Sequence, residues 1–149
     1  MKDNCLPILK DQILDYQRYE QGQIKIIGYS GYRHSDCVVK DMMSYAEWIK
    51  TYHTYPVIKV EGIESIQEIR QHYNNCVNIH LFVNQQYGFS FNWHKDDVNV
   101  RLCVLKGKKY VWIRDKHYIL YPAQSVIITK GYLHRVCSQQ DTWALSVGY

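Results

Sequence analysis

The second half of the chain alternates apolar and polar residues in short runs, which is the pattern of half-buried β-strands. Turn-forming residues separate the runs, for example at residues 85–88 and 138–141. We predict eight strands, over residues 77–83, 89–93, 98–105, 110–114, 117–120, 125–129, 133–137 and 143–148. Short strands with turns between them favour a sandwich or a barrel, and we predict a mainly β jelly roll.

The first 75 residues have a different pattern, in which apolar residues recur at helical spacing and form broad apolar faces. We expect helices over residues 6–20, after a cap at Asp41 or Ser44, and through Ile63, Ile66, Ile69 and Tyr73, with a short strand over residues 23–29. No linker, internal repeat or low-complexity tract interrupts the chain. We therefore predict a single domain over residues 1–149, in which a mixed helical cover (1–75) precedes a jelly-roll core (76–149).

The composition is that of an ordinary folded protein, with 46% hydrophobic and 21% charged residues in 149 positions. No apolar run approaches the roughly 18 residues of a membrane span, and no signal-peptide core follows the first residues. The five cysteines are odd in number, scattered and without a Cys-x-x-Cys pair, which argues against a disulfide framework or a zinc site. We expect reduced thiols, no membrane partner and a cytoplasmic location.

The net charge of +4 is mildly basic and is partly concentrated at Lys106-Gly107-Lys108-Lys109. A glycine between two apolar strands predicts a hairpin turn with a solvated face. A phosphate or nucleic-acid surface is the alternative, but the fourteen tyrosines are dispersed rather than arranged as a stacking platform. Nucleic acid is therefore the less favoured partner.

The strongest chemical signal is His94-Lys95-Asp96, followed forty positions after His94 by His134. Side chains two residues apart on a strand point to the same face, so His94 and Asp96 can converge on one ion while a second strand supplies His134. Two imidazoles and one carboxylate, with open positions opposite them, suit non-haem Fe(II). A second pair, His34-Ser35-Asp36, lies among turn-forming residues, and we interpret it as a solvated loop.

Further motifs follow the His-x-Asp pair in order. They are a strand (98–105), a Lys-Gly-x-Lys turn (106–109), Pro122 before an apolar strand, and Tyr132-Leu133-His134-Arg135-Val136. Together with Phe91-Asn92-Trp93, they resemble the core of the JmjC and cupin-type 2-oxoglutarate oxygenases. The resemblance covers residues 76–149, extends weakly over residues 41–52, and implies a double-stranded β-helix of the cupin type.

The resemblance implies that His94, Asp96 and His134 are iron ligands and that the protein uses Fe(II), 2-oxoglutarate and O₂. Lys109, fifteen positions after His94, matches the lysine that binds the distal carboxylate of 2-oxoglutarate in the protein-hydroxylase branch. The chemistry explains the lysine, because a buried carboxylate is costly unless a cation or hydrogen-bond donors meet it. Lys108 should then face the other side of its strand.

The chain departs from that branch at positions around the first histidine. Val100 stands where the protein hydroxylases often have an asparagine, with Asn99 one place earlier, and Phe91 stands where a threonine or serine is common. The polar partner of the distal carboxylate is therefore unassigned. The candidates for co-substrate binding besides Lys109 are Asn99, Tyr87, Tyr132 and Ser146.

The resemblance also implies an activity, the hydroxylation of a C–H bond by a dioxygenase. The lysine spacing is that of the protein hydroxylases, so a peptide, protein or amino-acid side chain is the expected substrate. Aromatic and basic residues of the first half could shape the substrate side, either around a polypeptide or as stacking partners for a base: Tyr29, Tyr32, Arg33, His34, Tyr52, His53 and Tyr55.

Two alternatives to this activity stay open. A metal-cupin enzyme that does not use 2-oxoglutarate would often recruit a further histidine, and His80 or His117 could serve. A non-catalytic jelly-roll binding module would need no metal at all. Iron content and 2-oxoglutarate binding separate these alternatives from the oxygenase.

Overall fold

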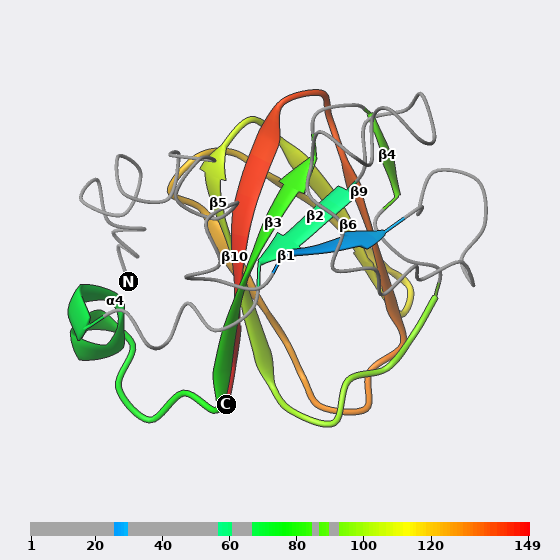
Figure 1. The fold of residues 1–149 in the computed structure, drawn as a ribbon. Helices are drawn as coiled ribbons and strands as arrows, with labels where there is room; N and C mark the ends of the chain where they lie inside the picture. Colours follow the sequence, from blue (N-terminus) through cyan, green and yellow to red (C-terminus); the bar gives the residue numbers. More distant parts are fainter. Residues whose placement is uncertain (1–25, 30–56, 61–66, 85–86, 90–92) are drawn as a thin grey trace.

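Two antiparallel β-sheets make up most of the chain that the computed structural model describes, which is residues 26–29, 57–60, 67–84, 87–89 and 93–149 (Figure 1). The larger sheet has the strand order β1-β2-β3-β10-β5-β8, and the smaller sheet has the order β4-β9-β6-β7. The strands are β1 (Ile26–Tyr29), β2 (Val57–Val60), β3 (Asn78–Asn84), β4 (Gly88–Phe89), β5 (Val100–Lys106), β6 (Lys109–Ile113), β7 (Lys116–Leu120), β8 (Ser125–Ile128), β9 (His134–Ser138) and β10 (Thr142–Gly148). A short helix, α4 (Gln67–His72), precedes β3.

The path of the chain between the two sheets identifies the fold. From β3 onward, β3, β5, β8 and β10 lie in the larger sheet, whereas β4, β6, β7 and β9 lie in the smaller one. The sheets therefore each combine strands from both ends of this segment, and the neighbouring strands are antiparallel. This is the topology of a jelly roll, or double-stranded β-helix, so the predicted mainly β fold class is confirmed.

The strands predicted for residues 77–148 are present, with small shifts at their ends. The prediction for residues 89–93 corresponds to β4, and residues 90–92 lie outside the described residues. The short strand predicted over residues 23–29 is β1. The sequence pattern does not predict β2, because four residues are too few to show alternation and the strand is held by its pairing with β1 and β3.

The helical part of the prediction is described only at α4, which lies within the helix predicted through Ile63 and Tyr73. The helices predicted over residues 6–20 and after Asp41 or Ser44 lie outside the described residues. In the part of the chain that the structure describes, no helix has the length and apolar character needed to cross a membrane.

The basic segment at residues 106–109 is a corner between the two sheets, so the predicted hairpin is wrong. β5 ends at Lys106 and pairs with β8 and β10, whereas β6 begins at Lys109 and pairs with β7 and β9. Gly107 has a φ of +81°, which glycine adopts without strain, and an added Cβ would lie 2.8 Å from the backbone of Thr142. A turn that contains glycine can form either a hairpin or a corner between two sheets. Which of the two forms depends on the strands with which β5 and β6 pair.

The central strands β3, β10 and β5 of the larger sheet are buried on both faces. Inward-facing residues of both sheets form one core cluster, which consists of Val100, Leu102, Val104, Val111, Ile113, Leu120, Ile128 and Ala144. On the other face of the larger sheet, Ile79, Leu81, Val83 and Leu145 are at most 1% exposed. Burial on both faces explains why strands β5 and β10 are almost continuously apolar rather than alternating.

The cysteines do not all follow the expectation of reduced thiols. Cys76 and Cys137 are free, but Cys103 on β5 forms a disulfide. Cys103 alternates with the inward-facing Leu102 and Val104, so it lies on the outer face of the larger sheet. The number and spacing of cysteines do not show which of them meet in space, and the expectation is wrong at Cys103 for that reason.

Candidate metal centre

A pair of backbone hydrogen bonds brings the two histidines of the predicted iron site together. The His94 N–H donates to the His134 carbonyl at 3.0 Å, and the His134 N–H donates to the His94 carbonyl at 2.9 Å. Nearby, the Gly131 N–H donates to the Asp96 carbonyl at 3.0 Å. The segment from His94 to Asp96 therefore runs antiparallel beside the start of β9, and this bridge fixes its register.

The side chains of His94, Asp96 and His134 converge at this bridge. Nε2 of His134 lies 3.1 Å from Oδ2 of Asp96, and Nε2 of His94 lies 3.8 Å from Oδ1 of the same carboxylate. The two imidazole centroids are 4.2 Å apart. The potential ligand atoms of the three residues all lie within 4.8 Å of one another. The structure thus brings the three predicted ligands together, whereas His34 and Asp36 lie outside the described residues.

The place where the side chains of His94, Asp96 and His134 converge is buried on one side and open on the other. The side chain of His134 is 3% exposed, whereas those of His94 and Asp96 are 33% and 34% exposed. An ion held by the three residues would therefore have protein on the side of His134. It would remain accessible from the side of His94 and Asp96.

The carbonyl of Tyr132 fixes the orientation of the His134 ring. Nδ1 lies 2.9 Å from this oxygen, which can only accept a hydrogen bond, so Nδ1 carries the proton and Nε2 is directed at Asp96. Burial lowers the pKa of His134, but the hydrogen bonds with Asp96 and Tyr132 raise it more, and the resulting pKa lies above the ordinary value. A proton and a metal ion therefore compete for Nε2.

The donor set fits a divalent transition metal. Ligand atoms that bind one ion at about 2.1 Å lie roughly 3–4 Å apart, which is close to the separations of these three residues. Two imidazoles and one carboxylate on one face, with further positions open, are typical of non-haem Fe(II) sites. The same donors also bind other divalent ions, so affinity alone does not select iron.

Lys109 lies inside the barrel, at a different level of the same inner surface. It is the first residue of β6 and faces Ser138, while the last residue, Ile113, faces His134. Four residues of extended strand separate these levels, about 13 Å. Lys109 is 1% exposed. Lys108 points the other way, with its Nζ 5.1 Å from the centroid of the Tyr110 ring.

Burial lowers the pKa of Lys109 to about 8, and among the described residues no carboxylate pairs with it. Two more polar residues lie buried on the same inner surface, Asn84 at 1% and Ser138 at 0% exposure. Neither the amide of Asn84 nor the hydroxyl of Ser138 has a hydrogen-bond partner within the described part of the chain. Each such group costs about 1–3 kcal/mol, so this cluster calls for an explanation.

Asn84 and Ser138 were not among the residues predicted for the site, although the sequence contains a signal for them. Ser138 lies four residues after His134 on β9, and residues two or four apart on a strand share a face. The same alternation places Asn84 with Phe82 on β3. The sequence pattern does not show that the side chains of Asn84 and Ser138 lack hydrogen-bond partners among the described residues, because this depends on residues far away in sequence.

Two of the other predicted co-substrate residues are exposed. Asn99 is on the surface, and its side-chain oxygen accepts a hydrogen bond from the Lys130 N–H at 2.9 Å. Tyr87 is 58% exposed, and a hydrogen bond with Cys137 raises the pKa of its hydroxyl. Asn99 therefore holds the turn after β8, and Tyr87 lies against the outer face of the smaller sheet.

The remaining two border the interior. Tyr132 packs against the core cluster, and the guanidinium of Arg114 lies 3.5 Å from the centroid of its ring. Ser146 on β10 faces the interior between its partners His80 on β3 and Leu102 on β5. Ser146 is thus directed inward at the level of the core cluster, whereas Tyr132 acts on His134 through its carbonyl.

The two histidines considered as additional ligands also differ in exposure: one lies on an inner face and the other on an outer face. His80 shares the inner face of the larger sheet with Ser146 and is half-buried. His117 is exposed on the outer face of the smaller sheet, where its ring stacks on Trp112 with a centroid distance of 4.7 Å. Neither belongs to the group formed by the three predicted ligands.

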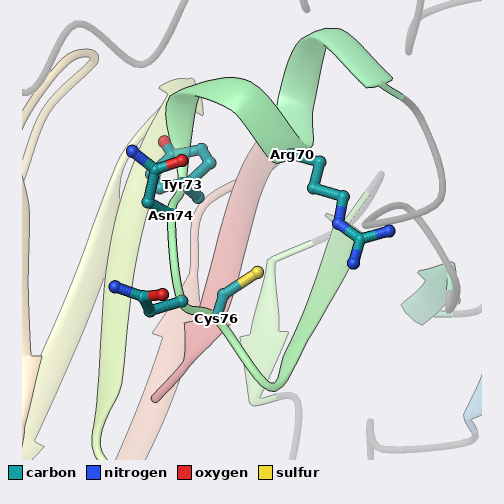
Figure 2. Close-up of a pocket in the computed structure, with 5 residues that line it drawn as sticks. Arg70, Tyr73, Asn74 and Cys76 are labelled. Carbon is teal, nitrogen blue, oxygen red and sulfur yellow. The ribbon is translucent and has the colours of Figure 1, made fainter.

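A separate hollow of about 500 Å³ lies between α4 and β3. Figure 2 shows that its lining comes from the end of the helix and from the segment that leads into the strand: Arg70, Tyr73, Asn74, Asn75 and Cys76. None of the residues predicted for the metal or the co-substrate lines it.

Comparison with known proteins gives similarities of fold. No family model matches the chain, and no curated protein matches it in sequence. Among solved structures, an RmlC-like cupin from Shewanella frigidimarina is 10% identical with a TM-score of 0.49, covering 62% of this chain and 74% of that one. A cupin superfamily protein from Desulfitobacterium hafniense is 14% identical with a TM-score of 0.46, covering 51% of this chain and 69% of that one. A cupin-like protein from Thermotoga maritima is 19% identical with a TM-score of 0.45, covering 64% of this chain and 68% of that one.

The variant Asp96→Ala should lose tight Fe(II) binding, because two imidazoles alone leave a site too weak to survive purification. His134→Ala should behave in the same way. Asp97→Ala is the matched control, since Asp97 is exposed and lies outside the three-residue group. Elemental mass spectrometry of each protein after loading with Fe(II) and desalting measures its iron content and checks this prediction. Stoichiometric iron in the Asp96→Ala protein would contradict the assignment of ligands.

The variant Lys109→Met should stabilise the protein at pH 7 in the absence of 2-oxoglutarate. The pKa of Lys109 is lowered from 10.5 to about 8, so below pH 8 the folded state holds a buried charge that costs roughly 3 kcal/mol. Between about pH 8 and 10.5 the folded state releases this proton before the unfolded state does, and the stability of the wild type rises. The advantage of Lys109→Met in urea unfolding should therefore shrink from pH 7 to pH 10, and a constant difference would refute the explanation.

Proposed function

We propose that the protein is an Fe(II)- and 2-oxoglutarate-dependent dioxygenase that hydroxylates a C–H bond. The observation that supports this best is the arrangement of two sites on one inner surface. The His94, Asp96 and His134 group lies at one level of the β6–β9 pair, and the buried Lys109 lies at another. 2-Oxoglutarate has a metal-chelating 2-oxo acid at one end and a carboxylate at the other, so its two ends match these two sites.

The surface between the two levels matches the middle of such a ligand. The pair Val111 and Val136 lies between the pair Ile113–His134 and the pair Lys109–Ser138. Val111 is 0% exposed. A molecule that reaches from the metal to the ammonium of Lys109 must be polar at both ends and apolar between them, which describes a short dicarboxylate with a methylene chain.

His94, Asp96 and His134 would hold the iron, which with 2-oxoglutarate and O₂ supplies an oxidant strong enough to hydroxylate a C–H bond. The protein's own part is binding, orientation and the exclusion of water. Asp96 contributes negative charge against the cation, and the Tyr132 carbonyl holds the His134 ring in its binding orientation. Lys109 meets the distal carboxylate, which would otherwise be too costly to bury.

The substrate we propose is a peptide, protein or amino-acid side chain. This part of the proposal rests on the spacing of Lys109 after His94, which is similar to that of the protein hydroxylases. The half-exposed edge formed by His94 and Asp96 leaves a route for such a substrate. The aromatic and basic residues expected on the substrate side, from Tyr29 to Tyr55, have side chains outside the described part of the structure.

A second candidate function is that of a metal-cupin enzyme that does not use 2-oxoglutarate. The observation in its favour is His80, a further histidine on the inner face of the larger sheet. This enzyme would bind a metal ion, but 2-oxoglutarate would have no effect on it. A non-catalytic binding module would show neither property.

Succinate formation tests the proposal directly. The iron-loaded protein is incubated with 2-oxoglutarate under air, with panels of peptides, amino acids and nucleosides, and succinate is quantified. We expect substrate-stimulated succinate from a peptide or amino-acid panel, together with a product that is heavier by one oxygen atom. Stimulation by nucleosides alone would overturn the substrate class, and iron binding with no succinate in any panel would favour the second candidate.

The variant Lys109→Met should raise the 2-oxoglutarate concentration needed for half-maximal succinate formation by about two orders of magnitude. Methionine fills the space but removes the cation, and a buried carboxylate that loses its partner costs about 2–5 kcal/mol. Lys108→Ala is the matched control, because Lys108 points to the outer face over Tyr110. Equal losses in the two variants would mean that the basic charge, rather than the inward-facing lysine, matters.

A further inference from the structure

The outer face of the smaller sheet presents a group of aromatic residues to solvent. Tyr110 and Trp112 on β6 alternate with the inward-facing Val111, so their side chains point away from the core. Their cross-strand partners on β7 are Ile119, which is 44% exposed, and His117, which is also exposed. Single apolar residues are normal on a protein surface, whereas a group of them marks a place where a partner binds.

The rings of Tyr110, Trp112 and His117 are aligned with one another. The centroids of His117 and Trp112 are 4.7 Å apart with 17° between the ring planes, and those of His117 and Tyr110 are 6.2 Å apart with 15°. The amide of Gln139 also donates a hydrogen bond to the Tyr110 hydroxyl at 2.9 Å. Rings that already hold one another in place lose little freedom when a flat ligand stacks on them.

Positive charge borders these rings. Nζ of Lys108 lies 5.1 Å from the centroid of the Tyr110 ring and 5.2 Å from that of Tyr121, which follows β7 and is 50% exposed. Arg135 on β9 is the cross-strand partner of Trp112, so it lies on the same face. Together these residues form a surface that we call the outer aromatic surface: Lys108, Tyr110, Trp112, His117, Tyr121 and Arg135.

No acidic residue balances this charge within the strands of the smaller sheet. The sequences of β4, β6, β7 and β9 contain no aspartate or glutamate. Asp115 lies in the turn between β6 and β7. Asp141, which follows β9, is paired with Lys106, with 2.6 Å between Oδ2 and Nζ. The outer aromatic surface therefore favours an anionic partner.

We propose that the outer aromatic surface binds single-stranded nucleic acid. Unpaired bases stack on aromatic side chains whatever their sequence, and the phosphates between them contact lysine and arginine. The fourteen tyrosines are dispersed in the sequence, which made nucleic acid the less favoured partner, but the β6–β7 hairpin brings Tyr110 and Tyr121 to the same lysine. A duplex hides its base faces, so it would meet only the cations of this surface.

This surface is separate from the candidate metal centre. Val111 faces the interior, whereas Tyr110 and Trp112 on either side of it face outward. Nucleic acid bound on the outer face would tether the protein to a strand without entering the candidate metal-binding group. Changes at the surface should therefore leave iron content and the 2-oxoglutarate requirement as they are in the wild type, and the proposal stands or falls independently of the proposed function.

Fluorescence anisotropy of labelled oligonucleotides with the iron-loaded protein tests the proposal. Oligothymidylate and oligouridylate of about twelve nucleotides should bind, and the duplexes that they form with their complements should bind at least about tenfold more weakly. The logarithm of the binding constant should fall linearly with that of the salt concentration, with a slope of roughly −1.4 to −2.1 for two or three phosphate contacts. Equal binding of single strand and duplex, or no binding of either, would overturn the proposal.

Trp112→Ala and Tyr121→Ala should each weaken single-strand binding by about tenfold or more, because each removes a ring on which a base stacks. Trp112→Phe keeps a ring and should bind nearly as well as the wild type. Tyr149→Ala is the matched control, since Tyr149 is 39% exposed and follows β10 of the larger sheet. Wild-type affinity in both Trp112→Ala and Tyr121→Ala, or an equal loss in Tyr149→Ala, would refute the stacking.

The salt dependence tests the charged part of the surface. Lys108→Ala should reduce the magnitude of the salt slope by about 0.7, the contribution of one phosphate contact on a single strand. Lys130→Ala removes an exposed lysine after β8 of the larger sheet, and it should leave the slope unchanged. A wild-type slope in Lys108→Ala, or an equal reduction in Lys130→Ala, would contradict the assignment of the phosphate contact.

Sedimentation velocity shows whether a second copy of the chain covers this face instead. We expect Trp112→Ala to sediment like the wild type when no oligonucleotide is present. A wild-type dimer that Trp112→Ala converts to monomers would overturn the proposal and assign the face to self-association. Asp96→Ala should bind oligonucleotides like the wild type, and a loss of binding in this variant would place nucleic acid at the metal centre rather than on the outer face.

Discussion

The two backbone hydrogen bonds between His94 and His134 are the contact on which the rest of the site depends. They join a segment outside the named strands to the first residue of β9, and they set the register in which His94, Asp96 and His134 face one another. A slip of one residue would turn these side chains to the opposite face. Because β9 is itself held between β4 and β6, the jelly roll rather than a free loop positions the candidate metal-binding group.

The inner surface between the sheets combines features that a merely stable barrel would avoid. The core cluster supplies the apolar contacts, yet Lys109, Asn84 and Ser138 are buried beside it without matching partners in the described residues. Such groups lower stability, and proteins keep them where a ligand needs them. The pair Val111 and Val136 separates these groups from the level of His134. The result is an elongated inner surface with a buried lysine at one end and a candidate metal-binding group at the other.

Much of this arrangement followed from the sequence, and the rest depended on contacts between distant residues. The alternation of strand residues predicted the core strands and the opposite directions of Lys108 and Lys109. His94 and Asp96 do converge, but the segment that carries them lies outside the named strands and is held by its bridge to His134. The alternation did not show that residues 106–109 turn from one sheet into the other, since this depends on which strands flank β5 and β6. The unsatisfied state of Asn84 and Ser138 is likewise a property of their surroundings in space.

An anaerobic titration tests whether one ligand joins the metal to the buried lysine. A 2-oxo acid that chelates Fe(II) gives a visible charge-transfer band, which reports the metal and the co-substrate together. We expect this band for the iron-loaded wild type on addition of 2-oxoglutarate, no band for Asp96→Ala, and a much higher half-saturating concentration for Lys109→Met. No band in the iron-loaded wild type, or identical titration curves for wild type and Lys109→Met, would contradict it.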